Sequence, residues 1–301
     1  MKYAITHRTV YNYSSGVALC HNEARLLPRE TPWQICHPHR LAIRPRPALS
    51  IERQDFFGNR VLYFVIQDIH QKLEVTVTTG VRVLDARPFA ESSPSPPWEQ
   101  ALATLRENPD PEMIEARQFA LDSPFVAAAP TFLEYAAPSF PPGKPLLEAV
   151  ADLNRRIHAE FTYDPHFTTV ATPLKKVLRE RRGVCQDFAH LAIACLRALG
   201  LAARYVSGYL ETLPPPGRPR LVGADASHAW LAVYVPGAGW AEFDPTNDCM
   251  PGEKHITLAW GRDYGDVAPL KGVMTGGGSH SLDVSVDVAP QPEGEAEIRF
   301  S

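Results

Sequence analysis

The chain has 301 residues, of which 45% are apolar and 21% are charged, and its formal net charge is −4 at pH 7. This composition is typical of a soluble globular protein with a sizeable core, and it excludes a fibrous or disordered chain. Lysine and arginine are scattered rather than gathered in one tract, so we expect no nucleic-acid partner. The longest apolar helical stretch, residues 191–206, contains two arginines and is too polar to cross a bilayer.

The start of the chain and its cysteines predict a cytoplasmic location. The first residues alternate polar and apolar side chains instead of following a basic tip with an apolar run, so we expect no signal peptide. An odd number of cysteines with wide, irregular spacing argues against a secreted disulfide framework. We therefore expect free thiols at all five positions, which are Cys20, Cys36, Cys185, Cys195 and Cys249.

Residues 1–84 predict an N-terminal antiparallel β-domain, which we expect to be a sandwich. Residues 73–83, LEVTVTTGVRV, alternate with period 2 and are rich in Val and Thr, as in a sheet with one solvated face. The strands that we expect are residues 2–13, 39–46, 59–67 and 72–84, with a turn at DFFGN. Residues 85–100 are rich in proline and serine and predict a linker.

Beyond the linker the sequence predicts an α+β core over residues 101–270, with helices packed on an antiparallel sheet. The helices that we expect lie within residues 109–121, 145–163, 174–182 and 185–199, the last of them ending at Gly200. Strands follow at residues 203–210, 228–236 and 240–246. Residues 271–301 predict a C-terminal extension with an edge strand and a frayed end.

Cys185 is the first candidate for chemistry because it lies at the beginning of a predicted helix, directly after a turn that contains Gly183. Free backbone N–H groups and the helix dipole stabilise an anion at this place and favour a thiolate. The alternative is a small core residue, which is the usual role of cysteine. A cationic partner is needed for catalysis, and a histidine is the natural one.

His228 is the candidate partner because it begins a predicted strand, where functional residues are common. His190 lies on the same helix as Cys185 but faces another side. Asp244, at the end of the next strand, is the candidate for orienting the imidazole of His228. A three-residue hairpin loop at 236–238 would place Asp244 opposite Trp230 and diagonal to His228, whereas an even loop without a bulge would separate their faces.

Three motifs give the sequence a resemblance to the transglutaminase-like superfamily, in family order: RRGVCQDFAHLAIACLRALGLAARYVSGYL, ASHAWLAVYVPGAGW and FDPTND. HNEARLLPR and DFFGN resemble the β-rich N-terminal region of bacterial members. The resemblance implies a papain-like core with Cys185 as nucleophile, His228 as general base and acid, and Asp244 as its orienting group.

The residues that would support the substrate are less clearly marked by the sequence. Some family members use an indole or polar side chain upstream of the cysteine, and Tyr163, with the backbone N–H of Cys185, is our candidate oxyanion donor. Gln186 is a further candidate for contact with the substrate. Asp187 either braces the loop or favours the helix dipole. Residues 212–227 are a candidate flap, in which Arg218 and Arg220 would read an acidic group.

These residues predict a thiol-dependent hydrolase or acyltransferase that acts on a peptide or protein amide through a thioester, with proteolysis favoured over cross-linking. The alternative is a non-catalytic binding module of the same fold. A metal site built from Cys20, His21, Cys36, His37 and His39 fits no familiar zinc spacing, so we favour solvated histidines there. No segment resembles a calcium loop, and we expect neither a metal nor another cofactor.

Overall fold

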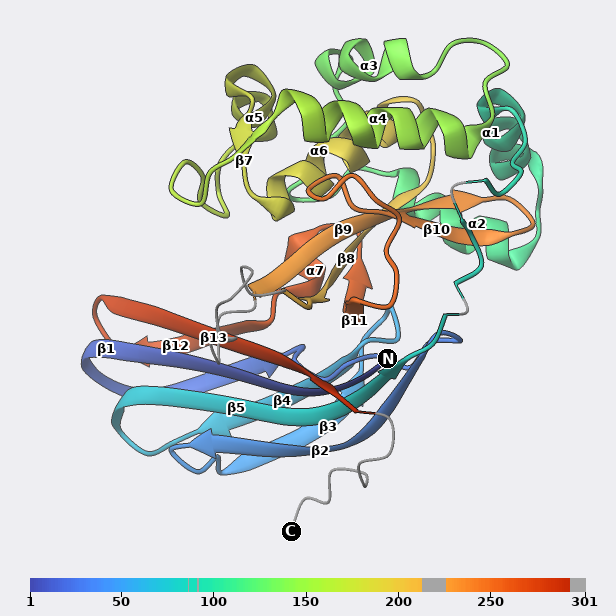
Figure 1. Cartoon of the computed structure of the whole chain (residues 1–301). Helices are drawn as coiled ribbons and strands as arrows, with labels where there is room; N and C mark the ends of the chain where they lie inside the picture. Colours follow the sequence, from blue (N-terminus) through green and yellow to red (C-terminus); the bar gives the residue numbers. More distant parts are fainter. Residues whose placement is uncertain (86, 91, 213–225, 293–301) are drawn as a thin grey trace, which may run out of the picture.

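The computed structural model describes residues 1–85, 87–90, 92–212 and 226–292 of the chain (Figure 1). It has a β-domain built from the two ends of the chain and an α+β core between them. The expected α+β class with an antiparallel β-domain is confirmed. Within the described ranges, no helix is long and apolar enough to cross a membrane.

The β-domain is one seven-stranded antiparallel sheet in the order β2-β5-β1-β4-β3, with β12 and β13 also paired to β1. Its strands are β1 (Lys2–Ala24), β2 (Gln34–Arg44), β3 (Leu49–Gln54), β4 (Arg60–Ile66), β5 (His70–Val83), β12 (Leu270–Gly276) and β13 (His280–Gln291). The sequence analysis did not predict β3, whose residues are all exposed and whose apolar alternation is limited to Leu49 and Ile51.

The long strand β1 carries both halves of this sheet. Its first half pairs with β5 and β13, and its second half pairs with β4 and β12. The register shifts between Asn12 and Val17, where a bulge lets the sheet curl. Buried side chains of β4 and β5, such as Phe64 and Val75, share one core with Val17. The expected sandwich is thus a single sheet that curls across one continuous strand.

The C-terminal extension supplies two strands to this sheet, where the sequence predicted one edge strand. Residues 2–13 of β1 pair with β13, and residues 17–24 pair with β12. The predicted core therefore ends near residue 269, and the following residues return to the N-terminal domain (Figure 1). The predicted frayed end, at residues 293–301, lies outside the described residues.

The core packs helices on a four-stranded antiparallel sheet in the order β10-β9-β8-β11. Its strands are β8 (Ala203–Leu210), β9 (Ala226–Val235), β10 (Gly239–Phe243) and β11 (His255–Gly261), and a short parallel pair joins β6 (Thr162–Tyr163) to β7 (Arg182–Gly183). The helices are α1 (Trp98–Glu107), α2 (Pro111–Arg117), α3 (Pro130–Ala136), α4 (Leu146–Glu160), α5 (Leu174–Glu180), α6 (Cys185–Ala198) and α7 (Tyr264–Val267). Helices α1, α3 and α7 and strand β11 were not predicted, and the linker ends at Pro97 because α1 begins at Trp98.

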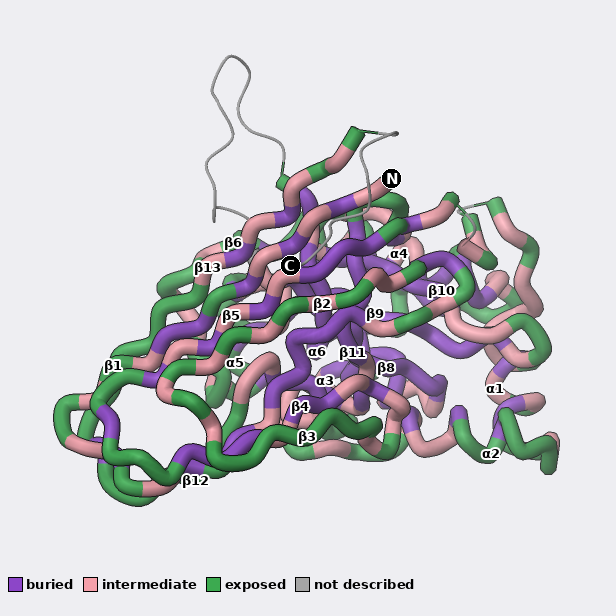
Figure 2. The backbone as a smooth tube through the Cα atoms, turned by 90° about the horizontal axis from the view of Figure 1, so that it is seen from below, coloured by how far each residue is buried: buried purple, intermediate pink, exposed green. Residues whose placement is uncertain are grey.

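Helix α6 is the central element of the core. Every residue from Asp187 to Arg197 is buried, and Figure 2 shows the buried backbone gathered around α6, β8 and β11. The helix ends as predicted at Gly200, which has a φ of +85°. The N–H of Leu201 donates to the carbonyl of Leu196 over 2.9 Å, which closes the helix with a C-terminal glycine motif. Burial on all sides fixes α6, and with it the position of Cys185.

Candidate active site

Cys185 is the first residue of α6, and the turn before it is held by Asp187. The Asp187 carboxylate accepts hydrogen bonds from the Val184 N–H (2.9 Å) and the Thr168 hydroxyl (2.6 Å). A Cβ atom on Gly183 would lie 2.8 Å from the Asp187 carboxylate oxygen, so the turn needs glycine. Burial raises the pKa of Asp187, while these hydrogen bonds oppose the shift. Of the two roles left open by the sequence, Asp187 therefore braces the loop.

The β9–β10 hairpin brings His228 and Asp244 to one face. Val235 pairs with Gly239, which leaves a three-residue loop at 236–238, and Phe243 pairs with Leu231. Asp244 follows directly, and one further step of this register corresponds to Trp230, in line with the parity argument. The His228 Nε2 atom lies 2.7 Å from an oxygen of Asp244, so the predicted contact forms without a bulge in the hairpin.

The Asp244 carboxylate is fully buried and accepts five hydrogen bonds. One oxygen accepts from the N–H groups of Thr246 (2.9 Å) and Asn247 (3.3 Å). The other accepts from the Asn247 side chain (2.7 Å), His228 (2.7 Å) and His255 (3.1 Å). Burial alone would raise the pKa of Asp244, but the hydrogen bonds from His228 and His255 outweigh it and lower that pKa well below its usual range. Asp244 is therefore ionised at neutral pH.

His255, at the start of β11, is a site residue that the sequence analysis missed. Its Nδ1 accepts a hydrogen bond from the Gly252 N–H (3.3 Å), so its Nε2 carries the proton and donates to Asp244. Burial lowers the pKa of His255, which keeps the ring neutral. No sequence motif marked this residue, because the strand HITLAWG resembles an ordinary apolar strand.

Gly208 on β8 makes room for the aromatic side chains of this site. The indole of Trp230 lies over β8 and reaches the ring of His255, with 5.4 Å between ring centroids. A Cβ atom on Gly208 would lie 2.4 Å from the Trp230 ring and 2.2 Å from the carbonyl oxygen of Ile256. The close approach of the indole to the backbone of β8 therefore depends on glycine at this position.

His228 is held in its charged form between two acidic groups. Burial lowers its pKa, but hydrogen bonds and charge interactions with Asp244 and Cys185 outweigh burial and raise the pKa to about 10. Because Asp244 occupies Nε2, Nδ1 is the nitrogen that remains for the thiol of Cys185. The arrangement can hold a thiolate beside an imidazolium, the ion pair that makes cysteine a nucleophile at neutral pH.

Tyr163 and Gln186 both lie near the nucleophile. Tyr163 pairs with Gly183 in the β6–β7 ladder and is 53% exposed. Burial, followed by the charges of Cys185 and Asp187, raises the pKa of Tyr163, which places its phenol within electrostatic reach of the thiol. Gln186 is half-buried in the first turn of α6. Neither position contradicts the predicted supporting roles, which stay predictions.

Other candidate residues have structural surroundings. His190 accepts a hydrogen bond from the Tyr264 N–H (3.1 Å), and burial lowers its pKa to about 3, so it is neutral. Burial raises the pKa of Cys36 to about 12 and also raises that of Cys195. Arg218 and Arg220 of the predicted flap lie outside the described residues.

Among the described residues, the groups that could together hold a metal ion are His228, Asp244 and His255, whose ligand atoms lie within 4.8 Å of one another. Among the same described residues, the cysteines and histidines considered as a metal site in the β-domain do not form such a cluster. The His228 and His255 nitrogens approach a single Asp244 oxygen at hydrogen-bond distances, 2.7 and 3.1 Å. These are the distances expected when two imidazole N–H groups donate hydrogen bonds to one carboxylate oxygen.

A curled β-domain and a papain-like core, with a cysteine at a buried helix and a histidine–aspartate pair on the facing hairpin, define the class of the protein. The model of the bacterial transglutaminase-like N-terminal region matches residues 3–82, and that of the transglutaminase-like superfamily matches residues 135–245. An uncharacterized protein of Mycobacterium tuberculosis is 44% identical over 98% of this chain and 94% of its own length. An uncharacterized Mycobacterium leprae protein is 33% identical over 94% of this chain and 97% of its own length.

The chain therefore belongs to the transglutaminase-like superfamily. A protein-glutamine gamma-glutamyltransferase of Pseudomonas aeruginosa is 31% identical over 36% of this chain and 19% of its own length. A solved structure from Cytophaga hutchinsonii, described as a candidate cysteine protease, covers 100% of this chain and 94% of its own, with a TM-score of 0.75 and 22% identity. These similarities support thiol-dependent catalysis in general terms.

Proposed function

We propose that the protein cleaves or transfers the acyl group of a peptide or protein amide, with Cys185 as nucleophile, His228 as general acid and base, and Asp244 as the orienting group. The proposal rests on His228, which is hydrogen-bonded to Asp244 over 2.7 Å and raised in pKa by both Asp244 and Cys185. A lone cysteine in a core would not need a charged imidazole beside it.

The reaction proceeds in two halves. The Cys185 thiolate attacks the carbonyl carbon, and the carbonyl electron pair moves to oxygen. As this intermediate collapses, the carbon–nitrogen bond breaks and His228 gives its proton to the leaving nitrogen, which releases an amine or ammonia and leaves a thioester. Neutral His228 then takes a proton from water or from a second amine as it attacks the thioester. The acyl product leaves and the thiolate is restored.

Two donors fit the oxyanion of this intermediate. The backbone N–H of Cys185 lies in the first turn of α6, where intrahelical acceptors are missing and the dipole favours negative charge. The Tyr163 phenol is the second donor, supported by its electrostatic interaction with Cys185. A Tyr163→Phe variant should lose roughly 10²–10³-fold in the acylation rate, the usual effect of removing one oxyanion donor.

We propose hydrolysis ahead of transfer to an amine. The Pseudomonas aeruginosa relative is named for glutamyl transfer, and the Cytophaga hutchinsonii neighbour is described as a candidate protease, so the names of similar chains do not decide between the two outcomes. A single partition experiment separates them: the thioester is formed from an activated ester, and release of free acid is compared with release of amide at increasing lysine concentration.

The first test is the pH dependence of alkylation by iodoacetamide at each cysteine, mapped by mass spectrometry. Cys185 should react fast below neutral pH, and the His228→Ala variant should lose this advantage. His166→Ala, at an exposed histidine, is the matched control and should leave the profile unchanged. If Cys185 reacts no faster than Cys249 in the native protein, the nucleophile is misassigned and a non-catalytic binding module becomes the better interpretation.

We also propose a cytoplasmic location. All five cysteines are free and burial seals Cys20 and Cys195, which suits a reducing compartment. A membrane-impermeant maleimide applied to intact cells should leave Cys185 unlabelled, whereas lysed cells should show labelling. Equal labelling in both samples would contradict this location.

A further inference from the structure

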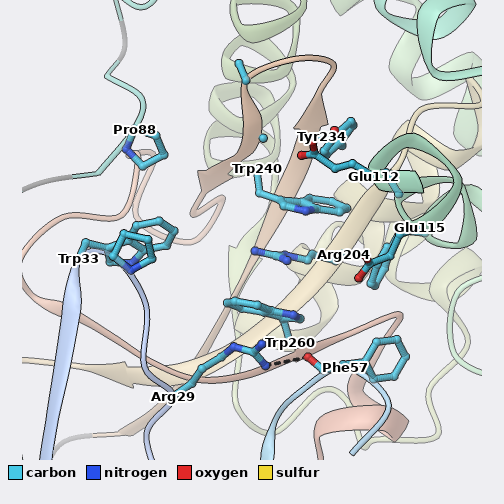
Figure 3. Close-up of a pocket in the computed structure, with 15 residues that line it drawn as sticks. Arg29, Trp33, Phe57, Pro88, Glu112, Glu115, Arg204, Tyr234, Trp240 and Trp260 are labelled. Carbon is cyan, nitrogen blue, oxygen red and sulfur yellow. Dashed lines mark hydrogen bonds between the residues drawn. The ribbon is translucent and has the colours of Figure 1, made fainter. Parts of the chain in front are cut away.

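A cavity of about 500 Å³ lies where the β-domain, α2 and the core sheet meet (Figure 3). Its lining includes Trp33, Trp240 and Trp260 together with Arg29 and Arg204, but none of Cys185, His228 and Asp244. It is therefore separate from the candidate active site. Its volume is in the range of small-molecule sites, which usually combine aromatic walls with a few placed polar groups.

Four side chains form a stack along one wall of this cavity (Figure 3). The guanidinium carbon of Arg204 lies 4.3 Å from the ring centre of Trp240 and 3.8 Å from that of Trp260. Arg29 covers the other face of Trp260 at 3.4 Å. The two indoles hold the Arg204 guanidinium flat, so that only its edge remains for hydrogen bonding.

Arg204 is 5% exposed and, among the described residues, has neither a hydrogen bond nor an ion pair. Its Nε atom is sealed off without a partner, whereas its terminal nitrogens are not sealed and reach the cavity. Arg197, which is also buried, instead donates to carbonyls of Phe119, Ala203 and Arg262. A buried cation without an acceptor lowers stability, so the bare edge of Arg204 points to an acceptor that the chain does not supply.

Arg29 adds a second positive charge to the same wall, since its hydrogen bonds go to the uncharged oxygens of Phe57 and Asn59. Glu112 and Glu115 of α2 line the cavity too and are exposed. The charge of Glu242, which does not line the cavity, acts on Arg204, and that of Glu115 acts on it more weakly. The cavity thus has two cations, two anions and an indole wall at Trp33. Its charges suit a ligand that carries both signs.

We propose that this cavity binds a short peptide with a free C-terminus, with its carboxylate on the edge of Arg204 and its ammonium group near Glu112 and Glu115. A planar carboxylate matches the fork of a guanidinium, which it can contact with both oxygens. A phosphate dianion would be repelled by the two glutamates, and a single amino acid would leave most of the cavity empty. The proposal concerns binding alone and does not depend on the activity of Cys185.

Calorimetric titration of the full chain with the dipeptide Ala-Phe and its blocked forms tests the proposal. Ala-Phe should bind with a Kd below about 1 mM. Its C-terminal amide should bind at least tenfold more weakly because the carboxylate is lost. The affinity of N-acetyl-Ala-Phe should lie between those of Ala-Phe and its amide. Tryptophan fluorescence follows the same titrations, since three of the five tryptophans line the cavity. Equal affinity for acid and amide, or tighter binding of inorganic phosphate, would overturn the assignment.

Two variants locate the binding. Arg204→Met keeps an unbranched side chain beside the indoles but removes the guanidinium, and it should weaken the binding of Ala-Phe at least tenfold, with folding checked by circular dichroism. Arg179→Met, at an arginine remote from the cavity lining, is the matched control. If Arg204→Met does not fold, the double variant Glu112→Gln and Glu115→Gln still decides, because both residues are exposed. It should bind N-acetyl-Ala-Phe as the native protein does and lose the preference for Ala-Phe.

Discussion

At the scale of single residues, the candidate site depends on Asp244, to which two histidines in opposite protonation states are bound. His228 is charged, with a pKa raised to about 10 by Asp244 and Cys185 against the effect of burial, whereas burial keeps His255 neutral. The sequence predicted the contact of His228 with Asp244 because hairpin parity is a local property. It could not predict the contact of His255 with Asp244, because this contact joins β11 to the end of β10, three positions away in the sheet.

Replacing His255 should destabilise the protein through Asp244. His255→Leu removes one hydrogen bond to a buried carboxylate, and such bonds contribute about 1.5–3 kcal/mol. Urea unfolding should show a loss of this size, and His255→Gln, which keeps an N–H donor, should recover most of it. If the leucine and glutamine variants are equally unstable, packing rather than the hydrogen bond to Asp244 explains the effect.

The charge of His228 should make stability fall as the pH rises. Its folded pKa of about 10 exceeds the ordinary value of 6.5, so the folded state holds the extra proton between these pH values. The stabilisation is complete below about pH 6.5 and is lost as the pH approaches 10. His7 and His190 have the opposite effect on stability. Burial lowers their pKa values to about 4 and 3, so they contribute stability that is present above about pH 6.5 and is lost as the pH falls towards these values.

Urea unfolding at several pH values between 6.5 and 10 measures this slope. The His228→Gln variant should show a flatter dependence than the native protein in this window, and His166→Gln should keep the native slope. Parallel curves for all three proteins would mean that His228 is not held charged in the folded state.

At the scale of elements, the predicted features are those that neighbouring residues decide. Gly200 ends α6, as the sequence indicated, and of the hairpin loops that the sequence left open, the three-residue one sets the register of β9 and β10. Strand β11 was missed although it is almost entirely buried, because a short apolar run does not by itself distinguish a strand from other buried segments. The sequence could not predict that Trp230 crosses over β8 either, since this contact depends on the order of the strands in the sheet.

Gly208→Ala tests that crossing. The added methyl would lie 2.4 Å from the Trp230 ring and 2.2 Å from the Ile256 carbonyl oxygen, so the backbone of β11 or the indole must move. Overpacking of this kind costs about 1–3 kcal/mol, and it should also weaken the contact of His255 with Asp244. Thermal unfolding measures the loss. Gly252→Ala, where no atom lies within 4 Å of the added Cβ, is the matched control and should be nearly neutral.

At the scale of the whole molecule, the two ends of the chain form one sheet around the long strand β1. Tyr3 pairs with Val81 on one side and with Pro290 on the other. Period-2 alternation in residues 276–288 predicted a strand, but alternation does not say which strand becomes its partner. The β-domain therefore begins with the N-terminal residues and is completed only by β12 and β13.

Removing residues 270–301 should disrupt the β-domain itself and not only the C-terminal extension. Val286 and Val288 of β13 are buried in the same cluster as Tyr3 and Ile5 of β1 and Leu231 of β9. Their loss exposes apolar surface worth about 1.5–3 kcal/mol for each buried valine and leaves both halves of β1 with open edges. A chain that ends at residue 269 should lose cooperative unfolding and protection of β1 amides in hydrogen exchange, whereas a chain that ends at residue 292 should keep both. Native protection of β1 in the shorter chain would show that the first five strands are stable without β12 and β13.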